Sequence, residues 1–172
     1  MIMDWNVRYL RQLSQAGGVD VVAHRAYYES AQFWSPELYR EFIAPRLRRE
    51  IELVHEAGAK FCYIMVERQM PLLPILKEIG VDILFGIDPA ERGMDLGRVK
   101  EEVGDQICLW GGVSEHITME SVDSQRIEGE VGAAIDALAP RGGFILSAVD
   151  NRPGLLWKST DYLIDAWRRM SC

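Results

Sequence analysis

Residues 71–87 read PLLPILKEIGVDILFGI and place a helix-like run, Pro71–Ile79, directly before a strand-like apolar run, Val81–Ile87. The alternation extends outward in both directions, with further strand-like runs at Val19–His24, Phe61–Val66, Ile107–Val113 and Gly143–Val149. Each run is nearly continuous in apolar residues, which is typical of strands buried on both faces of a parallel sheet. The pattern therefore predicts a parallel α/β fold with five strands.

The helices between these strands carry start and stop signals. Ser35 can cap a helix, and Pro36 suits its first position. Pro45 should kink this helix because it removes a backbone donor, and Gly58 is placed to end it. Further helices are expected at Trp5–Gln15, Pro71–Ile79, Leu96–Val103, Ser124–Leu138 and Thr160–Met170.

Two architectures satisfy a regular alternation of strands and helices, in which right-handed crossovers join parallel strands. One is a complete five-stranded doubly wound sheet, and the other is part of a (β/α)8 barrel, which usually needs about 250 residues. Periodicity alone favours the doubly wound sheet, because 172 residues suit it. In both architectures the chemistry belongs at the carboxyl ends of the strands.

The composition is that of one globular domain, with 48% hydrophobic and 26% charged residues. The formal net charge of −7 argues against binding to nucleic acid or to a membrane surface. No apolar run approaches the roughly 20 residues of a membrane span, and the first residues lack a signal-peptide pattern. The 3 cysteines lie far apart and form neither a disulfide framework nor a metal knuckle, which favours the reducing cytoplasm as the compartment. From the length and composition we expect a single domain over residues 1–172.

Polar residues follow each predicted strand where it ends. These stretches are His24-Arg25-Ala26-Tyr27-Tyr28-Glu29, Glu67-Arg68-Gln69, Asp88-Pro89, Ser114-Glu115-His116 and Asp150-Asn151-Arg152. Arginines in such a set could bind a polyanion, and carboxylates together with His24 could hold a metal. Solvated loop residues and simple ion pairs are the plainer alternative for charges at strand ends.

Specific catalytic motifs are sparse. A catalytic zinc takes three protein ligands, which Glu67, Asp88 and His24 could supply, but no compact spacing supports such a site. The sequence has no GxSxG, GxGxxG or GxxxxGK[ST] motif, so a nucleophile elbow and those nucleotide-binding loops are disfavoured. The pairs Gly111-Gly112 and Gly142-Gly143 fit tight turns and close backbone approach better than a phosphate cradle.

Several stretches together resemble the uroporphyrinogen decarboxylase superfamily. They are SPELYREFIAP at residues 35–45, PLL at 71–73 with GVDIL at 80–84, LWGGV at 109–113, and GGFILSAVDN at 142–151. The resemblance implies a (β/α)8 barrel of which this chain is the C-terminal half, and this partial barrel replaces the doubly wound sheet as the expected fold. Five strands do not close such a barrel, so its open edges imply a homo-oligomer or association with a complementary half-barrel.

The superfamily has two main branches. One decarboxylates the tetrapyrrole uroporphyrinogen without a cofactor, and the other transfers methyl groups between a corrinoid and a thiol or other acceptor, usually with zinc. The last strand is more similar to the methyltransferases, which favours that branch over true uroporphyrinogen decarboxylase; a non-catalytic binding or assembly module is a further alternative. Neither signature is intact, because the zinc branch's His-x-Cys register falls on Ile64-Met65-Val66 and the decarboxylase histidine falls near Ala148.

The resemblance still implies a ligand pocket at the barrel mouth. It places Glu67, Asp88 and Asp150 there as candidate catalytic carboxylates, which can act as acid or base if burial raises their pKa. The candidate substrate-binding residues are His24, Arg25, Tyr28, Arg68, His116 and Arg152. Arginines at a mouth suit a carboxylate-bearing tetrapyrrole, because guanidinium and carboxylate pair in a bidentate manner.

Overall fold

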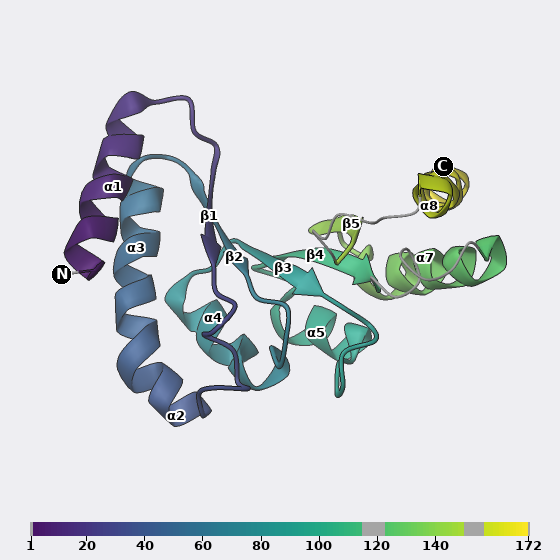
Figure 1. Ribbon diagram of the computed structural model, residues 1–172, viewed down its shortest axis with the longest axis horizontal. Coiled ribbons are helices and arrows are strands. Elements are labelled where there is room, and N and C mark those ends of the chain that lie inside the picture. Colours follow the sequence, from purple (N-terminus) through teal and green to yellow (C-terminus); the bar gives the residue numbers. More distant parts are fainter. Residues whose placement is uncertain (1, 115–122, 150–156, 172) are drawn as a thin grey trace. The chain divides into compact units, whose positions relative to one another are not determined.

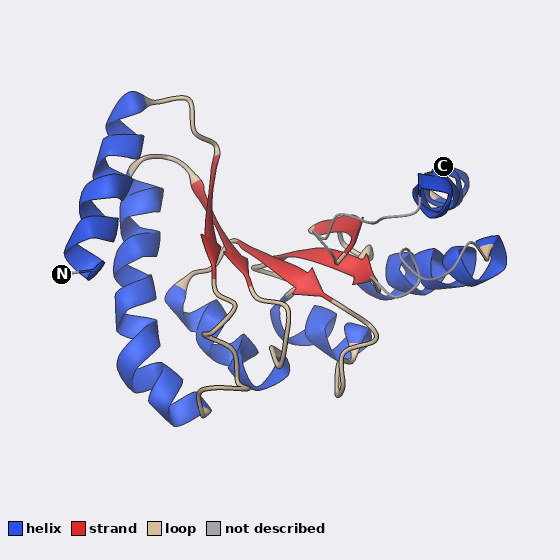
Figure 2. Ribbon diagram, viewed as in Figure 1, coloured by secondary structure: helices blue, strands red, loops and turns tan. Residues whose placement is uncertain are grey.

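The computed structural model describes residues 2–114, 123–149 and 157–171. Within these ranges the strands form one sheet in the order β1-β2-β3-β4-β5 (Figures 1 and 2). The strands are β1 (Val21–Arg25), β2 (Lys60–Ile64), β3 (Ile83–Ile87), β4 (Cys108–Val113) and β5 (Phe144–Ala148). Strand β1 pairs with β2, and β4 with β5, in parallel, which confirms the predicted α/β class.

The chain divides into two compact units, and the first is Met1–Leu84. Its helices are α1 (Ile2–Ala16), α2 (Pro36–Leu38), the π-helical η1 (Tyr39–Ile43), α3 (Ala44–Glu56), the 3-10 helical η2 (Met70–Leu72) and α4 (Leu73–Ile79). Helix α3 lies beside α1 and also packs against α4 and β2 (Figure 1). Its apolar stripe buries Leu47, Ile51 and Val54, as expected for an amphipathic helix.

The second unit is Phe85–Cys172 and has its own core. Its described helices are α5 (Leu96–Val103), α7 (Ser124–Leu138) and α8 (Trp157–Met170). Helix α7 packs against α8 and β4, with Val113, Ile127 and Val131 fully buried. The single-domain organisation stays a prediction. In the part of the chain that the structure describes, no helix is long and apolar enough to cross a membrane.

The sequence signals around α2 and α3 act as their chemistry suggests. The Ser35 side chain accepts the Leu38 N–H at 3.3 Å and caps α2. The irregularity expected at Pro45 takes the form of the π-helical segment η1 directly before it, which is one way to accommodate a residue with no N–H to donate. Gly58 follows the end of α3 with a φ of +78°, the left-handed position that favours glycine.

The glycine pair of β4 serves close packing. A Cβ atom at Gly111 would lie 2.5 Å from the Ile87 carbonyl oxygen, and one at Gly112 would lie 2.9 Å from the Ala134 Cβ. Both distances are too short for a side chain, so β4 can approach its neighbours only because these positions carry none. The predicted role in close backbone approach is confirmed.

Candidate functional site

The carboxyl ends of β1 and β2 carry exposed polar and aromatic side chains of the first unit. We call this set the rim; it comprises Arg25, Tyr27, Tyr28, Phe33, Glu67 and Arg68. The two strand ends are adjacent, because Arg25 pairs with Ile64 and the Ala26 N–H donates to the Ile64 carbonyl at 2.9 Å. The rim therefore lies at the strand ends where parallel α/β folds place their chemistry.

The loop that follows β1, residues 26–34, exposes large aromatic side chains. Tyr28 is 78% exposed and Phe33 is 53% exposed, and their rings meet edge to face with centroids 5.6 Å apart. The Arg25 guanidinium lies 5.2 Å from the centre of the Tyr27 ring and donates to the Tyr27 hydroxyl at 2.8 Å. Aromatic groups gathered at one end of a domain, rather than scattered singly, indicate a binding surface.

The loop after β2 exposes Glu67 and Arg68, and a hydrogen bond between a side chain and the backbone spans this loop. Gln69 is fully buried, and its side-chain amide donates to the Met65 carbonyl. Arg68 is exposed and has a φ of +50°, a left-handed conformation that few residues other than glycine adopt. Strained backbone of this kind is concentrated at functional sites, so the conformation supports a role for Arg68 in binding.

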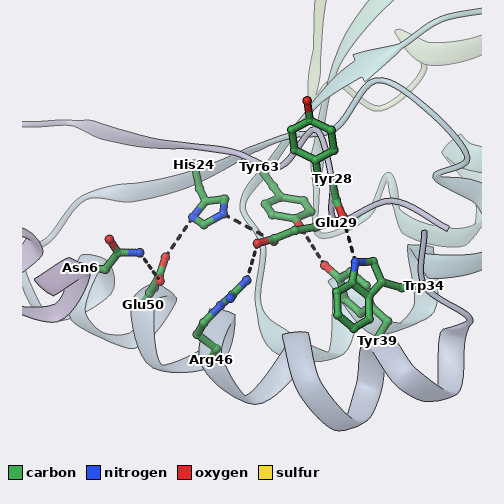
Figure 3. A network of polar contacts seen from close by, with 9 residues as sticks. All are labelled: Asn6, His24, Tyr28, Glu29, Trp34, Tyr39, Arg46, Glu50 and Tyr63. Carbon is green, nitrogen blue, oxygen red and sulfur yellow. Dashed lines mark hydrogen bonds and ion pairs between the residues drawn. The ribbon is translucent and has the colours of Figure 1, made fainter. Parts of the chain in front are cut away.

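A group of ion pairs and hydrogen bonds in the same unit fixes the loop after β1 (Figure 3). We call it the charge network; it comprises Asn6, His24, Glu29, Tyr39, Arg46, Glu50 and Tyr63. The His24 Nδ1 lies 3.0 Å from a Glu50 carboxylate oxygen, and its Nε2 lies 3.5 Å from Glu29. Glu29 also accepts from the Tyr63 hydroxyl at 2.7 Å and pairs with Arg46.

The outer members of the charge network extend it to α1 and η1. The Asn6 side-chain amide donates to Glu50 at 3.1 Å, and the Tyr39 hydroxyl donates to the Tyr63 hydroxyl at 2.8 Å. Tyr39 and Tyr63 are fully buried, and buried hydroxyls need such partners. The charge network thus joins two strands, three helical segments and the loop.

The charge network sets the protonation of its members. Burial lowers the pKa of His24, but hydrogen bonds to Glu29 and Glu50 and their negative charges outweigh burial and raise its pKa to about 9. Burial raises the pKa of both carboxyl groups, yet hydrogen bonds, led by that from His24, hold each pKa below its usual value. At neutral pH the cations His24 and Arg46 therefore balance the two carboxylates.

His24 and Arg25 have different surroundings although they are neighbours in β1. Successive side chains of a strand point to opposite sides, so His24 enters the charge network while Arg25 is exposed on the rim. Both ring nitrogens of His24 contact carboxylates. His24 therefore links the Glu29 and Glu50 carboxylates and stabilises the structure beside the rim.

Asp88 lies in the second unit, beyond the end of β3. Its carboxylate accepts the Ala90 N–H at 2.9 Å, which is a turn-forming contact. Glu130 of α7 accepts the Ser114 N–H at 3.0 Å beyond the end of β4. Burial, with the nearby charge of Asp88, raises the pKa of Glu130 above its usual value. Sequence reasoning missed Glu130, although its place beside the buried Val131 in α7 was a usable signal.

Within the first unit, the structure brings the predicted site residues Arg25, Tyr28, Glu67 and Arg68 to the ends of β1 and β2, and it holds His24 in the charge network. In residues 2–114, 123–149 and 157–171, no group of three or more His, Cys, Asp or Glu side chains is arranged to hold a metal ion. The predicted residues Asp150, His116 and Arg152 lie outside the described residues.

The strand order and the connections define the class: this is an α/β protein consistent with part of a (β/α)8 barrel. The sequence profile of the uroporphyrinogen decarboxylase (URO-D) family matches residues 1–149. The chain therefore belongs to the URO-D family, which confirms the resemblance seen in its motifs. No curated protein sequence matches the chain at a significant level.

Solved structures support the same fold. A methyltransferase from Methanosarcina mazei superposes with a TM-score of 0.78 at 19% identity, over 99% of this chain and 48% of the methyltransferase. A D-psicose 3-epimerase from Clostridium cellulolyticum H10 superposes with a TM-score of 0.57 at 15% identity, over 98% of this chain and 62% of the epimerase. These identities show the fold alone. The chain spans about half the length of the methyltransferase.

Proposed function

We propose that this chain binds a tetrapyrrole or corrinoid ring at the rim, as part of a URO-D-family protein that transfers a methyl group. The observation that carries the proposal is the combination of exposed aromatic and arginine side chains at the ends of β1 and β2. Such rings have broad apolar faces and carboxylate or amide groups at the edge. Aromatic side chains suit the faces, and Arg25 and Arg68 suit carboxylates.

Methyl transfer is favoured over uroporphyrinogen decarboxylation for two reasons. The stretch GGFILSAVDN at residues 142–151 is more similar to the methyltransferase branch, and the Methanosarcina mazei relative is described as a methyltransferase. Zinc usually serves that branch, but the described residues include no group of three or more His, Cys, Asp or Glu side chains arranged to hold it. A non-catalytic ring-binding module is the second candidate, because neither branch's metal or histidine signature is intact.

Carboxyl groups near the strand ends are the proposed sites of proton transfer. Glu67 on the rim and Asp88 in the second unit keep the roles that the family resemblance implies, as does Asp150. In the second unit, Glu130 adds a half-buried carboxyl group whose pKa burial raises above its usual value, which favours the protonated form that a general acid needs. Conversion of Glu67 to glutamine should lower turnover more than it lowers ring affinity, because the change removes no aromatic or arginine contact.

A spectral titration of the purified full chain with hydroxocobalamin tests the proposal. We expect saturable binding that Tyr28→Ala weakens about tenfold, the loss of one aromatic contact. Tyr9→Ala on α1 is the matched control, because Tyr9 is also an exposed aromatic residue but lies outside the rim. Equal effects of the two changes on affinity, or no binding at all, would refute ring binding at the rim. Conversion of uroporphyrinogen to coproporphyrinogen by the chain would favour the decarboxylase branch over methyl transfer.

We also propose that the chain works beside further strands, either in a homo-oligomer or with a complementary half-barrel. Strands β1 and β5 end the sheet order, and an open edge strand readily pairs with another strand. A strictly monomeric species over a wide concentration range, in the absence of any second polypeptide, would contradict the oligomer. The cytoplasm, expected from the separated cysteines, is the proposed compartment.

A further inference from the structure

The loop after β1 has one acidic side chain that turns inward. Glu29 lies among Arg25, Tyr27 and Tyr28 in sequence, yet its side chain is only 17% exposed while Tyr28 is 78% exposed. Figure 3 shows the Glu29 carboxylate inside the charge network and the Tyr28 ring pointing away from it. Of these two adjacent residues, Glu29 anchors the loop and Tyr28 faces outward.

We propose that Glu29 is a positioning residue, whose half-buried carboxylate holds loop 26–34 so that the aromatic side chains of the rim are preorganised for the ring. This inference rests on the proposed function. Side chains from three elements contact the Glu29 carboxylate: His24 of β1 at 3.5 Å, the Tyr63 hydroxyl of β2 at 2.7 Å, and Arg46 of α3. A group held from three directions has little freedom, and the backbone that carries it shares that restriction.

The other end of the loop has its own hydrogen bonds. The Trp34 indole N–H donates to the Tyr28 carbonyl at 2.9 Å. The backbone N–H groups of Phe33 and Trp34 donate to the carbonyl of the buried Ser30 at 3.0 and 3.2 Å. Between these bonds and Glu29, the tyrosines are held at both sides. Preorganised side chains bind more tightly because less freedom is lost on binding.

The charge of Glu29, and not its size alone, is what the site requires. Glu29→Gln keeps the shape of the side chain but leaves His24 and Arg46 to face Glu50 alone, so the charge network carries an excess positive charge. A buried charge without its partner is strongly unfavourable, and the exposed loop is the part that can move to admit water.

Glu50 provides a matched control within the same charge network. Like Glu29 it is a carboxylate that contacts a His24 nitrogen, and it is buried and also accepts a hydrogen bond from the Asn6 side chain. It lies on α3, however, and not on the loop. Glu50→Gln should therefore cost similar stability without releasing the rim.

Hydrogen exchange and hydroxocobalamin titration of the two full-length variants test the inference. In Glu29→Gln we expect the amide protection of residues 29–34 and the affinity each to fall about tenfold or more, with α4 amides unchanged. In Glu50→Gln both quantities should stay within about twofold of wild type. Should Glu29→Gln fail to fold, Tyr63→Phe removes one hydrogen bond to the Glu29 carboxylate and should also lower the amide protection of residues 29–34 and the affinity.

The outcomes separate this inference from the proposed function. Equal effects of Glu29→Gln and Glu50→Gln on affinity would reduce Glu29 to a stabilising residue and overturn the proposal. Unchanged protection of residues 29–34 in Glu29→Gln would overturn it as well. A wild-type chain that binds no hydroxocobalamin refutes the ring-binding function, while the exchange data still decide whether Glu29 holds the loop.

Discussion

Replacing His24 by glutamine should destabilise the protein in a pH-dependent way. Glutamine keeps a polar side chain that can contact Glu29 and Glu50, but it cannot carry the positive charge that balances them. The charge network would then hold two carboxylates against Arg46 alone. A buried, uncompensated charge of this kind is far more costly than an exposed one.

The magnitude follows from the pKa of His24. Its rise from 6.5 to about 9 corresponds to roughly 3 kcal/mol of stabilisation when the imidazole is protonated. Because the folded-state pKa is the higher one, this stabilisation is fully present below pH 6.5 and is lost as the pH rises through about 9. The two carboxyl groups, whose pKa values are lowered, stay ionised throughout this window.

Urea unfolding of wild type and His24→Gln between pH 6 and pH 10 measures the effect. The difference in unfolding free energy should be about 3 kcal/mol at pH 6 and should shrink by most of that amount by pH 10. His55→Gln is the control, since His55 is 41% exposed beside Asp82 and should cost about 1 kcal/mol or less. A His24→Gln difference that does not change with pH would refute the electrostatic account.

Three further changes test other parts of the structure. Gly111→Ala should cost roughly 3 kcal/mol or more in thermal or urea unfolding, because the new Cβ meets the Ile87 backbone, whereas Gly142→Ala, with open space around it and a φ of +75°, should cost only about 1 kcal/mol; equal costs would contradict the packing argument. Arg68→Gly should weaken hydroxocobalamin binding, because glycine accepts the left-handed backbone at this position but supplies no guanidinium for the ring's carboxylate or amide groups; unchanged binding would contradict a role for Arg68 in ring binding. Asp82→Ala should cost about 2 kcal/mol at pH 7, because a backbone amide loses its acceptor, and since the folded-state pKa of Asp82 is lowered this difference should fade on acidification; a difference that persists at pH 2 would argue for lost packing instead.

The strands and helices were predictable because their signals are local. Apolar runs mark strands wherever both faces are covered, and the predicted bounds of α5 and α7 coincide with those observed. The cap at Ser35 and the end of α3 at Gly58 depend on only a few neighbouring residues, so they were predictable too. The π-helical form of the irregularity before Pro45 was not, because a kinked helix has several solutions of similar energy.

The charge network escaped prediction because its contacts join residues far apart in the chain. Glu29 reads as a loop residue and Arg46 as part of a solvated helix face, and only the tertiary fold brings them together. One signal was available: Glu50 shares the apolar face of α3 with Leu47 and Val54, which marks a carboxylate facing the core. The rim was partly predicted, since Arg25, Tyr28 and Arg68 follow the expected strand ends.

The paired phenols of Tyr39 and Tyr63 give the first unit an internal optical marker. Burial raises the pKa of both hydroxyls, and for Tyr63 the neighbouring Tyr39 and Glu29 raise it further. These two of the protein's 6 tyrosines should therefore stay silent when tyrosinate absorbance is followed into alkali. Their ionisation should arrive together, at the pH where this half of the chain loses its native packing, so a simple absorbance scan reads the integrity of the scaffold without any label.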